Sequence, residues 1–460
     1  MKKGNYNMEF VAFDKARESC DIQDIIDQVA AGKLRDGDAV TVQGSIHRLK
    51  EMSGFAFVNV RSPRLVFQCI WEEDKSSVNI KDFGVEDCVR IEGNLVFDER
   101  SRLGFDIRID KMAKLAGPVE QLPVEISNDR KIDKLQLDTL LNHRPITLRN
   151  PKVRAAMRVA DGVMHAFRTV LRQEGFVEFV PPKIVQAGAE GGADMFEVDY
   201  FGEKAFLNQS PQMYKQIMVG VFNKAYCVAP AFRAEKHSTN RHINEYESLD
   251  LEMGFIDSFQ DLMELECRIF RHMFDLLNRE YAPELEMVLG RGRRLPELTS
   301  FPQIKFAEAK ELYAQAHKKA VTDPVDLSSD EEKWIGEHFL EKYDAPIVFL
   351  THYPAKKRPF YTMDDPTDPR YTLSFDCLMY GLEVTTGGQR IHDYNMQVEK
   401  MQRLGMPIES FDDYLAMHKF GMPPHGGFAL GLERIVQKLL ELDNIRRATA
   451  FPRDRDRVRP

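Results

Sequence analysis

The feature that most constrains the fold is a set of five short segments in which apolar and polar side chains alternate. They occupy residues 40–46, 55–60, 65–71, 88–93 and 105–109, and turn residues separate them. An alternation with a period of two residues is typical of β-strands that bury one face. The segments therefore predict five strands within residues 35–115.

Five strands in so short a stretch predict a small closed barrel, of the kind that binds oligonucleotides, over residues 35–117. A barrel that serves only for packing would carry the same pattern, so that alternative stays open. Residues 1–34 form an N-terminal extension to which we assign no role. Residues 118–149 predict a hinge because prolines punctuate them: Pro118, Pro123 and Pro145.

A helix with clear signals opens the remaining residues, 150–460. Asn150 can cap it, and Pro151 stands at the first helical position, where its missing N–H costs nothing. Gly175 ends it, and apolar side chains recur in between at helical spacing: Val153, Met157, Ala160, Met164, Phe167 and Leu171. We interpret this stripe as core or subunit interface. Further on, residues 285–345 are charge-rich and predict a helical insertion.

Composition excludes several classes of protein. The net charge of −9 argues against binding nucleic acid through bulk charge, although it leaves room for local basic patches. No apolar run approaches the ~20 residues that span a membrane, and the N-terminal residues lack the apolar core of a secretory signal. The six cysteines are scattered without a C-x-x-C pair, which argues against a zinc cluster or a disulfide framework and fits a reducing cytoplasm.

A charged strand pair is predicted at residues 229–255, with a polar, basic loop in its middle. On the second strand, Asp250 and Glu252 would face one side and four apolar side chains the other: Leu249, Leu251, Met253 and Phe255. Arg233 and Glu235 would likewise share a face. Taken alone, the same pattern suits a solvated hairpin decorated with ion pairs.

A glycine-rich strand at 426–431 runs into a helix that carries Arg434. Glycines let a ligand approach the backbone closely, and an arginine at such a junction can reach an anion. Residues 175–182, which follow the capped helix, supply a third segment. In their order and spacing along the chain, residues 175–182, 229–255 and 426–434 resemble the three signature motifs of class II aminoacyl-tRNA synthetases.

The chain resembles the aspartyl-tRNA synthetases of the archaeal and eukaryotic type, and this similarity covers most of its length. It lies in EGGA at 190–193, QSPQMYKQ at 209–216, FRAE at 232–235, TTGGQRIH at 385–392, PPHGG at 423–427 and FPRD at 451–454. The resemblance implies an α+β fold: an anticodon-binding OB-fold barrel, a hinge, and a catalytic domain on an antiparallel sheet flanked by helices. It also implies a homodimer with the first motif at its interface.

The activity implied by the resemblance is a ligation in two steps. L-aspartate is activated with ATP to aspartyl-adenylate, and the aspartyl group then passes to the 3′ end of tRNA(Asp). Such phosphorus chemistry depends mostly on positioning and on stabilising negative charge.

The implied ATP site consists of seven residues: Arg233, Glu235, Arg241, His242, Tyr246, Glu383 and Arg434. Arg233 would hold the α-phosphate and Glu235 the adenine edge, while Tyr246 and Arg434 would stack on the two faces of the adenine. Arg241 and His242, in the basic loop, would contact the β- and γ-phosphates. Three members of the site are taken as catalytic: Arg233, Glu235 and Arg434.

A magnesium ion is implied beside the phosphates. Glu383 and Asp376 would hold it, together with Thr386, because Mg²⁺ prefers carboxylate oxygens and bridges phosphates. Either acid could instead pair with an arginine, and the number of ions stays open.

The implied aspartate site consists of six residues: Glu190, Gln212, Lys215, Asp250, Thr386 and Arg390. Ser210 and Pro211 predict a helix start, which places Gln212 and Lys215 on one helical face. Lys215 and Arg390 would contact the side-chain carboxylate, with Asp250 keeping them oriented, and Glu190 and Gln212 would hold the amino end. Asparagine has nearly the same shape, but its neutral amide would leave two partly buried cations unpaired, at a cost of about 2–5 kcal/mol. A plain surface lysine at position 215 is the alternative.

The anticodon contact is implied for Phe57 and Gln68, which would stack on the central uracil and hydrogen-bond its edge. Phe57 also suits a place in the barrel core. The loops at 48–53 and 98–103 would read the third anticodon base, and whether tRNA(Asn) is charged as well stays open.

Two other functions remain as alternatives. An asparaginyl-tRNA synthetase would share the fold and the ATP motifs, although Lys215 and residues 385–390 favour aspartate. A catalytically inactive relative would bind RNA through its barrel, but the chain retains four residues that such a protein does not need: Arg233, Glu235, Glu383 and Arg434.

Overall fold

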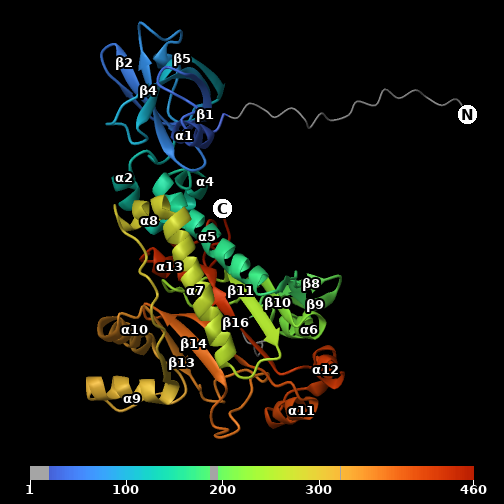
Figure 1. The fold of residues 1–460 in the computed structure, drawn as a ribbon. Coiled ribbons are helices and arrows are strands. Elements are labelled where there is room, and N and C mark those ends of the chain that lie inside the picture. The colour runs from blue at the N-terminus through green and yellow to red at the C-terminus, as the bar shows by residue number, and fades with distance from the viewer. Residues whose placement is uncertain (1–19, 187–194, 322) are drawn as a thin grey trace, which may run out of the picture. The chain divides into compact units, whose positions relative to one another are not determined.

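The structure, a computed structural model, describes residues 20–186, 195–321 and 323–460. The chain forms two compact units that divide after Pro151 (Figure 1). Most of the predicted N-terminal extension, residues 1–19, lies outside the described residues. Among the helices that the structure describes, none combines the length and apolar character needed to cross a membrane.

The first unit contains a closed five-stranded barrel with strand order β1-β2-β3-β5-β4. All five strands lie where the alternating segments predict them: β1 (Ala39–Glu51), β2 (Phe55–Arg61), β3 (Val66–Glu72), β4 (Cys88–Phe97) and β5 (Phe105–Ala116). In the described part of this unit, four short α-helices accompany the barrel: α1 (Ile22–Ala30), α2 (Asp129–Asp133), α3 (Leu137–Asn142) and α4 (Arg144–Thr147). Ile22 and Ile25 of α1 are buried in the barrel core.

The second unit is built on an eight-stranded sheet. Its strands, in spatial order, are β12 (Gln303–Lys305), β13 (Ile347–Thr351), β14 (Ser374–Met379), β15 (Leu382–Gln389), β16 (His425–Gly431), β11 (Glu245–Gly254), β10 (Lys224–Phe232) and β6 (Val177–Glu178). Neighbouring strands are antiparallel except at the two edges, where β12 pairs with β13 and β6 with β10 in parallel. The predicted α+β fold, with a small barrel and a large, mainly antiparallel sheet flanked by helices, is confirmed.

A smaller sheet and nine helices complete the described part of this unit. The small sheet has the order β7 (Ile184–Val185), β9 (Glu203–Leu207) and β8 (Glu197–Tyr200). The helices are α5 (Pro151–Gln173), α6 (Gln212–Phe222), α7 (Gln260–Glu280), α8 (Ala282–Leu289), α9 (Phe306–His317), α10 (Ser329–Tyr343), α11 (Tyr394–Arg403), α12 (Asp412–Lys419) and α13 (Leu432–Leu439). Helices α8, α9 and α10 fall within or beside the stretch read as a helical insertion.

The helix α5 begins at Pro151, as its capping signals predict, but its buried face differs from the predicted stripe. Val153, Met157 and Met164 are only partly buried. The face of α5 that is buried in the core instead includes small residues, among them Ala156 and Gly162, which the predicted stripe does not contain. A side chain at Gly162 would clash with Leu277 and Tyr281, so the small residues let α5 and α7 lie side by side (Figure 1).

The main core lies between α5, α7 and one face of the large sheet, which leaves the opposite face for a site. Leu249 and Leu251 of β11 are fully buried in this core, while Asp250 and Glu252 alternate with them. The prediction that Phe255 lies on the apolar face of this strand is wrong. This residue follows the end of the strand, has a positive φ of 59° and is 71% exposed, so the alternation no longer applies to it.

Candidate active site

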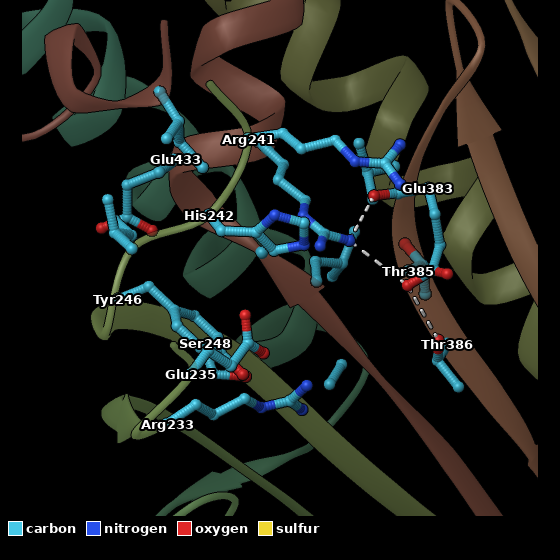
Figure 2. A pocket seen from close by; sticks show the side chains of 17 residues that line it. Arg233, Glu235, Arg241, His242, Tyr246, Ser248, Glu383, Thr385, Thr386 and Glu433 are labelled. Atoms are coloured by element: carbon cyan, nitrogen blue, oxygen red, sulfur yellow. Dashed lines mark hydrogen bonds and ion pairs between the residues drawn. The ribbon is translucent and has the colours of Figure 1, made fainter. Parts of the chain in front are cut away.

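A continuous cleft on the second face of the large sheet collects most of the predicted site residues. Strand β11, the loop before it, β15 and the β16–α13 junction supply its walls. The cleft brings together residues from every part of the predicted ATP, aspartate and metal sites: Arg233, Glu235, Arg241, His242, Tyr246, Gln212, Lys215, Asp376, Glu383, Thr386, Arg390 and Arg434. Figure 2 shows Arg233, Glu235 and Tyr246 on one side of the cleft and Glu383 with Thr386 on the other.

Glu190 is the one predicted site residue in the catalytic unit that lies outside the described residues. Asp250 lies under the floor of the cleft rather than in its wall. Phe57 and Gln68 belong to the barrel, in the first unit.

The strand pair β10–β11 carries the arginine that sequence analysis places on the α-phosphate. Arg233 directly follows β10, and its guanidinium lies over the ring of Tyr246, 5.7 Å from the ring centre. Its backbone N–H donates to the Asn244 carbonyl at 2.9 Å, which closes the loop between the strands. The hairpin thus fixes the backbone of Arg233, and the guanidinium lies on the side of the cleft nearest Tyr246.

The basic loop reaches across to helix α10. Arg241 donates to the Glu332 carboxylate at 3.0 Å. The pKa of Glu332 is raised to about 7, first by burial and then by the charge of Glu383, while Arg241 opposes the rise. The neighbouring His242 shares a 2.6 Å hydrogen bond with the Thr239 hydroxyl, and burial lowers the pKa of its ring. His242 is therefore a neutral donor at pH 7.

At the β16–α13 junction, Arg434 is fixed by Glu383. Its guanidinium donates to the Glu383 backbone carbonyl at 2.9 Å and to the carboxylate at 3.3 Å. The helix begins here because β16 ends at Gly431, whose extended backbone lets the chain turn into α13. The glycine-rich strand that runs into a helix is therefore confirmed.

A β-bulge decides which side chains of β15 face the cleft. Asp376 pairs with Thr386 and Cys377 with Thr385, but Leu378 pairs with Glu383, so β15 holds one extra residue at this point. Paired residues point to the same face of a sheet. The bulge therefore puts Glu383 and Thr386, three positions apart, together on the cleft face. Their side chains meet at 3.4 Å (Figure 2).

These residues fit a magnesium ion. Glu383 lies near Asp376, whose pKa is raised to about 6, first by burial and then by the Glu383 charge, with Arg358 opposing the rise. Mg²⁺ commonly uses one or two carboxylates together with substrate phosphates, and a divalent cation would relieve the repulsion between these acids. Asp376 also pairs with Arg358 at 2.7 Å, as the arginine alternative allows. Nowhere in the described ranges do three or more His, Cys, Asp or Glu side chains gather around one possible metal position.

The amino-acid end of the cleft holds a buried ion network. The Lys215 ammonium donates to Asp250 at 2.9 Å and to the Phe428 carbonyl at 3.3 Å, and lies 3.4 Å from Glu252. Lys215 is 1% exposed and both acids are 0% exposed, which excludes the surface-lysine alternative. Helix α6 begins at Gln212, as predicted, and places Lys215 here one turn into the helix.

Arg390 enters the same network from the end of β15. Its guanidinium donates to Glu252 at 2.8 Å, to the Gly427 carbonyl at 2.9 Å and to Gln212 at 3.4 Å. A side chain at position 427 would clash with Glu252 and the Leu251 carbonyl, so the glycine-rich strand is required for this approach. Burial alone would raise the pKa of Glu252, but Arg390 and Lys215 hold it below its ordinary value.

This network changes the argument for amino-acid selection. Both cations already have a carboxylate partner, so a neutral ligand would not leave them without a counter-charge. The cations present only N–H donors, whereas a carboxylate offers only acceptors. An asparagine amide would set its own NH₂ against one of these donors, and a buried donor without an acceptor costs about 1–3 kcal/mol or more.

Sequence reasoning missed three residues that organise the cleft: Glu252, Glu332 and Arg358. The alternation on residues 249–255 already places Glu252 beside Asp250 on the polar face, so a signal for it existed. The other two act through partners 91 and 18 positions away, and no local pattern indicates such pairs.

Glu433, the first-turn acid of α13, gives a prediction on stability. Its buried carboxyl group accepts the Glu247 backbone N–H. The pKa of Glu433 is raised from 4.5 to about 8, mainly by burial and also by the charges of Glu247 and Glu245, while backbone hydrogen bonds oppose the rise. Between these values the folded state keeps a proton that the unfolded state releases. Stability therefore falls as pH rises through this window, by up to about 1.4 kcal/mol per pH unit for this group.

In Glu433→Gln, the fall in unfolding free energy between pH 5 and pH 8 should become shallower by about that slope. Urea unfolding across the window measures it, with the exposed Glu337→Gln as control. Equal slopes for E433Q and the wild type would contradict the proton uptake.

The barrel places Phe57 and Gln68 on one face. Residues 56, 58 and 60 of β2 are buried in the core, so Phe57 points outward, which excludes the core alternative. Phe57 pairs with Ile70, and Asn59 with Gln68, so the two side chains are diagonal neighbours on the outer surface. The Gln68 amide donates to Asp106 at 3.2 Å.

Comparison with known proteins shows that this chain is similar to its relatives over most of its length. A family model described as tRNA synthetases class II (D, K and N) matches residues 136–455. An aspartate–tRNA(Asp/Asn) ligase of Thermus thermophilus is 40% identical over 93% of this chain and 98% of its own. An aspartate–tRNA(Asp/Asn) ligase of Deinococcus radiodurans is 39% identical over 92% of this chain and 96% of its own. An aspartate–tRNA(Asp) ligase of Thermococcus kodakarensis is 36% identical over 92% of this chain and 97% of its own.

Solved structures agree. The asparaginyl-tRNA synthetase of Pyrococcus horikoshii complexed with asparaginyl-adenylate aligns with a TM-score of 0.84 at 30% identity, covering 93% of this chain and 98% of that chain. A structure described as a putative aspartyl-tRNA synthetase, from Leishmania major, aligns with a TM-score of 0.83 at 26% identity, covering 95% and 94%. The motifs, the sheet that carries them and these matches agree, and the chain belongs to the class II tRNA synthetases of the D, K and N group.

Proposed function

We propose that this protein activates L-aspartate with ATP and transfers the aspartyl group to tRNA(Asp). The observation that carries the proposal is the buried network of Lys215, Arg390, Asp250 and Glu252 at the amino-acid end of the cleft. It offers N–H donors held in place by acids, which suits a side chain that only accepts hydrogen bonds. Relatives named as aspartate–tRNA ligases, at 34–40% identity, support the same substrate.

In the first step, an oxygen of the aspartate α-carboxylate attacks the α-phosphorus of ATP, and pyrophosphate leaves. Arg233 would hold the α-phosphate and balance the charge that develops on its oxygens. Arg241 and the neutral His242 would donate to the outer phosphates, and Glu235 would accept from the adenine edge. Mg²⁺, held by Glu383 and Asp376 with Thr386, would supply positive charge to the phosphates.

In the second step, a hydroxyl of the terminal tRNA adenosine attacks the acyl carbon of the adenylate, and AMP leaves. Lys215 and Arg390 would hold the side-chain carboxylate in both steps, with Gln212 and Glu190 at the amino group. Holding both reactants in one geometry accounts for much of the rate. The convergence of these groups in one cleft favours an active enzyme over an inactive RNA-binding relative.

The test is ATP–pyrophosphate exchange with each amino acid in turn. We expect kcat/KM for L-aspartate to exceed that for L-asparagine by about 10³-fold or more, since a site built around a polar group strongly rejects a mismatched one. A preference for asparagine would overturn the proposal in favour of the asparaginyl alternative.

A second tRNA substrate is supported by the relatives' names. Three relatives, 38–40% identical, are named for both tRNA(Asp) and tRNA(Asn). We propose tRNA(Asn) as a further acceptor, and aminoacylation of the two purified tRNAs with aspartate tests it. Charging of tRNA(Asp) alone would reject this extension and leave the main proposal intact.

The anticodon contact yields a separate prediction. Phe57→Ala should lower kcat/KM for aminoacylation of tRNA about 5- to 150-fold, because stacking of a base on an aromatic ring contributes about 1–3 kcal/mol. ATP–pyrophosphate exchange should stay unchanged, since it needs no tRNA. Phe255→Ala, an exposed phenylalanine of the catalytic unit, serves as the control. Unchanged aminoacylation in F57A would reject the stacking role.

We further propose that the protein is a homodimer and acts in the cytoplasm. The segment of the first motif carries exposed apolar side chains, with Val180 89% and Val177 38% exposed, which suits a partner surface. Five of the cysteines are free thiols, as a reducing compartment allows: Cys69, Cys88, Cys227, Cys267 and Cys377. Sedimentation of the purified protein would measure the mass of the assembly.

A further inference from the structure

Beneath the active-site sheet, helix α7 carries a glutamate in the middle of the apolar core. Glu266 is 0% exposed, and Leu262 and Phe270, one turn away on either side, belong to the same core. The polar groups beside its carboxyl are the Thr385 hydroxyl and the Cys377 thiol. Among the described residues, neither oxygen of Glu266 nor the Thr385 hydroxyl has a partner at full hydrogen-bond geometry.

An acid in such a place needs a reason, because burying a carboxyl group costs free energy and leucine would fill the same volume without that cost. Burial raises the pKa of Glu266 to about 8, although Thr385 and Cys377 oppose the rise. A neutral carboxyl has one O–H donor and free acceptor capacity, so it can bond a hydroxyl from either side. Glu266 and Thr385 are therefore matched polar groups in apolar surroundings.

The position of Thr385 makes this pair relevant to the site. Thr385 lies at the β-bulge of β15, on the core face, between Glu383 and Thr386 on the cleft face. The extra residue at the bulge is what brings those two side chains to the same side. A bulge interrupts the strand ladder, so a side-chain contact from below can fix its geometry.

Within the proposed function, we propose that Glu266 is a positioning residue for the metal and nucleotide side of the cleft. From under the sheet, its carboxyl group holds the Thr385 hydroxyl and thereby keeps the bulge that presents Glu383 and Thr386 together. Glu266 touches neither substrate nor metal, and its influence passes through Thr385.

Three variants test this. Glu266→Leu removes the polar group but keeps the volume, Glu266→Gln keeps a neutral donor and acceptor, and Thr385→Val removes the other partner. Glu264→Leu, two residues away on the exposed side of α7, is the matched control. Binding of ATP with Mg²⁺ is measured by calorimetry without amino acid, and KM for ATP and for aspartate by pyrophosphate exchange.

We expect E266L and T385V each to weaken ATP·Mg²⁺ binding and to raise the half-saturating Mg²⁺ concentration by about tenfold, as loss of a group that orients metal ligands does. The KM for aspartate should stay unchanged, and E266Q should behave like the wild type. The melting temperature of E266L should be equal or higher, which a merely structural role would not give. The double variant should lose no more than either single one.

Unchanged ATP·Mg²⁺ binding in both E266L and T385V would overturn the proposal, as would an equal loss for ATP and aspartate together with a lower melting temperature. The proposed function fails by a different result, namely exchange in the wild type that does not respond to aspartate. Calorimetry of ATP·Mg²⁺ separates the two because it requires no aspartate.

Discussion

Lys215→Met should lower kcat/KM for aspartate in pyrophosphate exchange about 10³-fold, while KM for ATP stays close to that of the wild type. The variant removes the only ammonium that lies within 3.4 Å of both Asp250 and Glu252 in the described network. Truncating one partner of a buried charge pair costs about 2–5 kcal/mol or more, and each 1.4 kcal/mol is a factor of ten. The substrate carboxylate would then face two acids and one cation.

The same change should lower the free energy of unfolding by about 3–5 kcal/mol, because Asp250 loses its ion-pair partner. A double variant, Lys215→Met with Asp250→Asn, separates the two effects: we expect it to regain much of the stability and none of the aspartate activation. Lys204→Met, on the exposed strand β9, is the control. Aspartate activation at the wild-type level in a folded K215M would remove Lys215 from the specificity site.

Arg233→Lys should reduce the rate of adenylate formation about 10²- to 10³-fold. Lysine keeps the charge but loses the planar fork that can hold two phosphate oxygens, and loss of one donor aimed at developing charge costs this much in other enzymes. The contact with Tyr246, whose ring lies 5.7 Å from the guanidinium carbon, would weaken as well. Single-turnover exchange with saturating aspartate and ATP measures the effect.

Arg455→Lys, an exposed arginine paired with Asp456, controls for the loss of a guanidinium elsewhere. The expected pattern is a fall in kcat that exceeds any rise in KM for aspartate. If R233K instead changed only KM for ATP, Arg233 would bind the nucleotide uniformly and would not act on the transition state.

The elements of this fold could be predicted where a local pattern decides them. The five barrel strands follow from alternation, α5 from Asn150 and Pro151, and α6 from Ser210 and Pro211. The buried face of α5 could not be predicted from large apolar side chains alone, because Gly162 and the alanines let α7 approach. Phe255 shows that alternation ends where the strand ends.

The residues that gather in the cleft could be predicted because the motifs resemble a known family, while their roles stay predictions. The ion pairs that fix the charged residues of the site could not be predicted from the sequence. Glu252 balances Lys215 and Arg390, and Glu332 holds Arg241, through pairs between elements distant in the chain. The bulge at Thr385 reverses the facing of side chains along β15, and alternation alone would have put Glu383 and Thr386 on opposite faces.

The central claim is that Lys215 and Arg390 read the acidic side chain of the substrate from a buried, charge-balanced network. A crystal structure of the protein with a non-hydrolysable aspartyl-adenylate analogue tests it most directly. We predict the Lys215 ammonium and the Arg390 guanidinium at about 2.7–3.2 Å from the bound side-chain carboxylate. A complex in which both cations stay on Asp250 and Glu252 and turn away from that carboxylate would contradict the account.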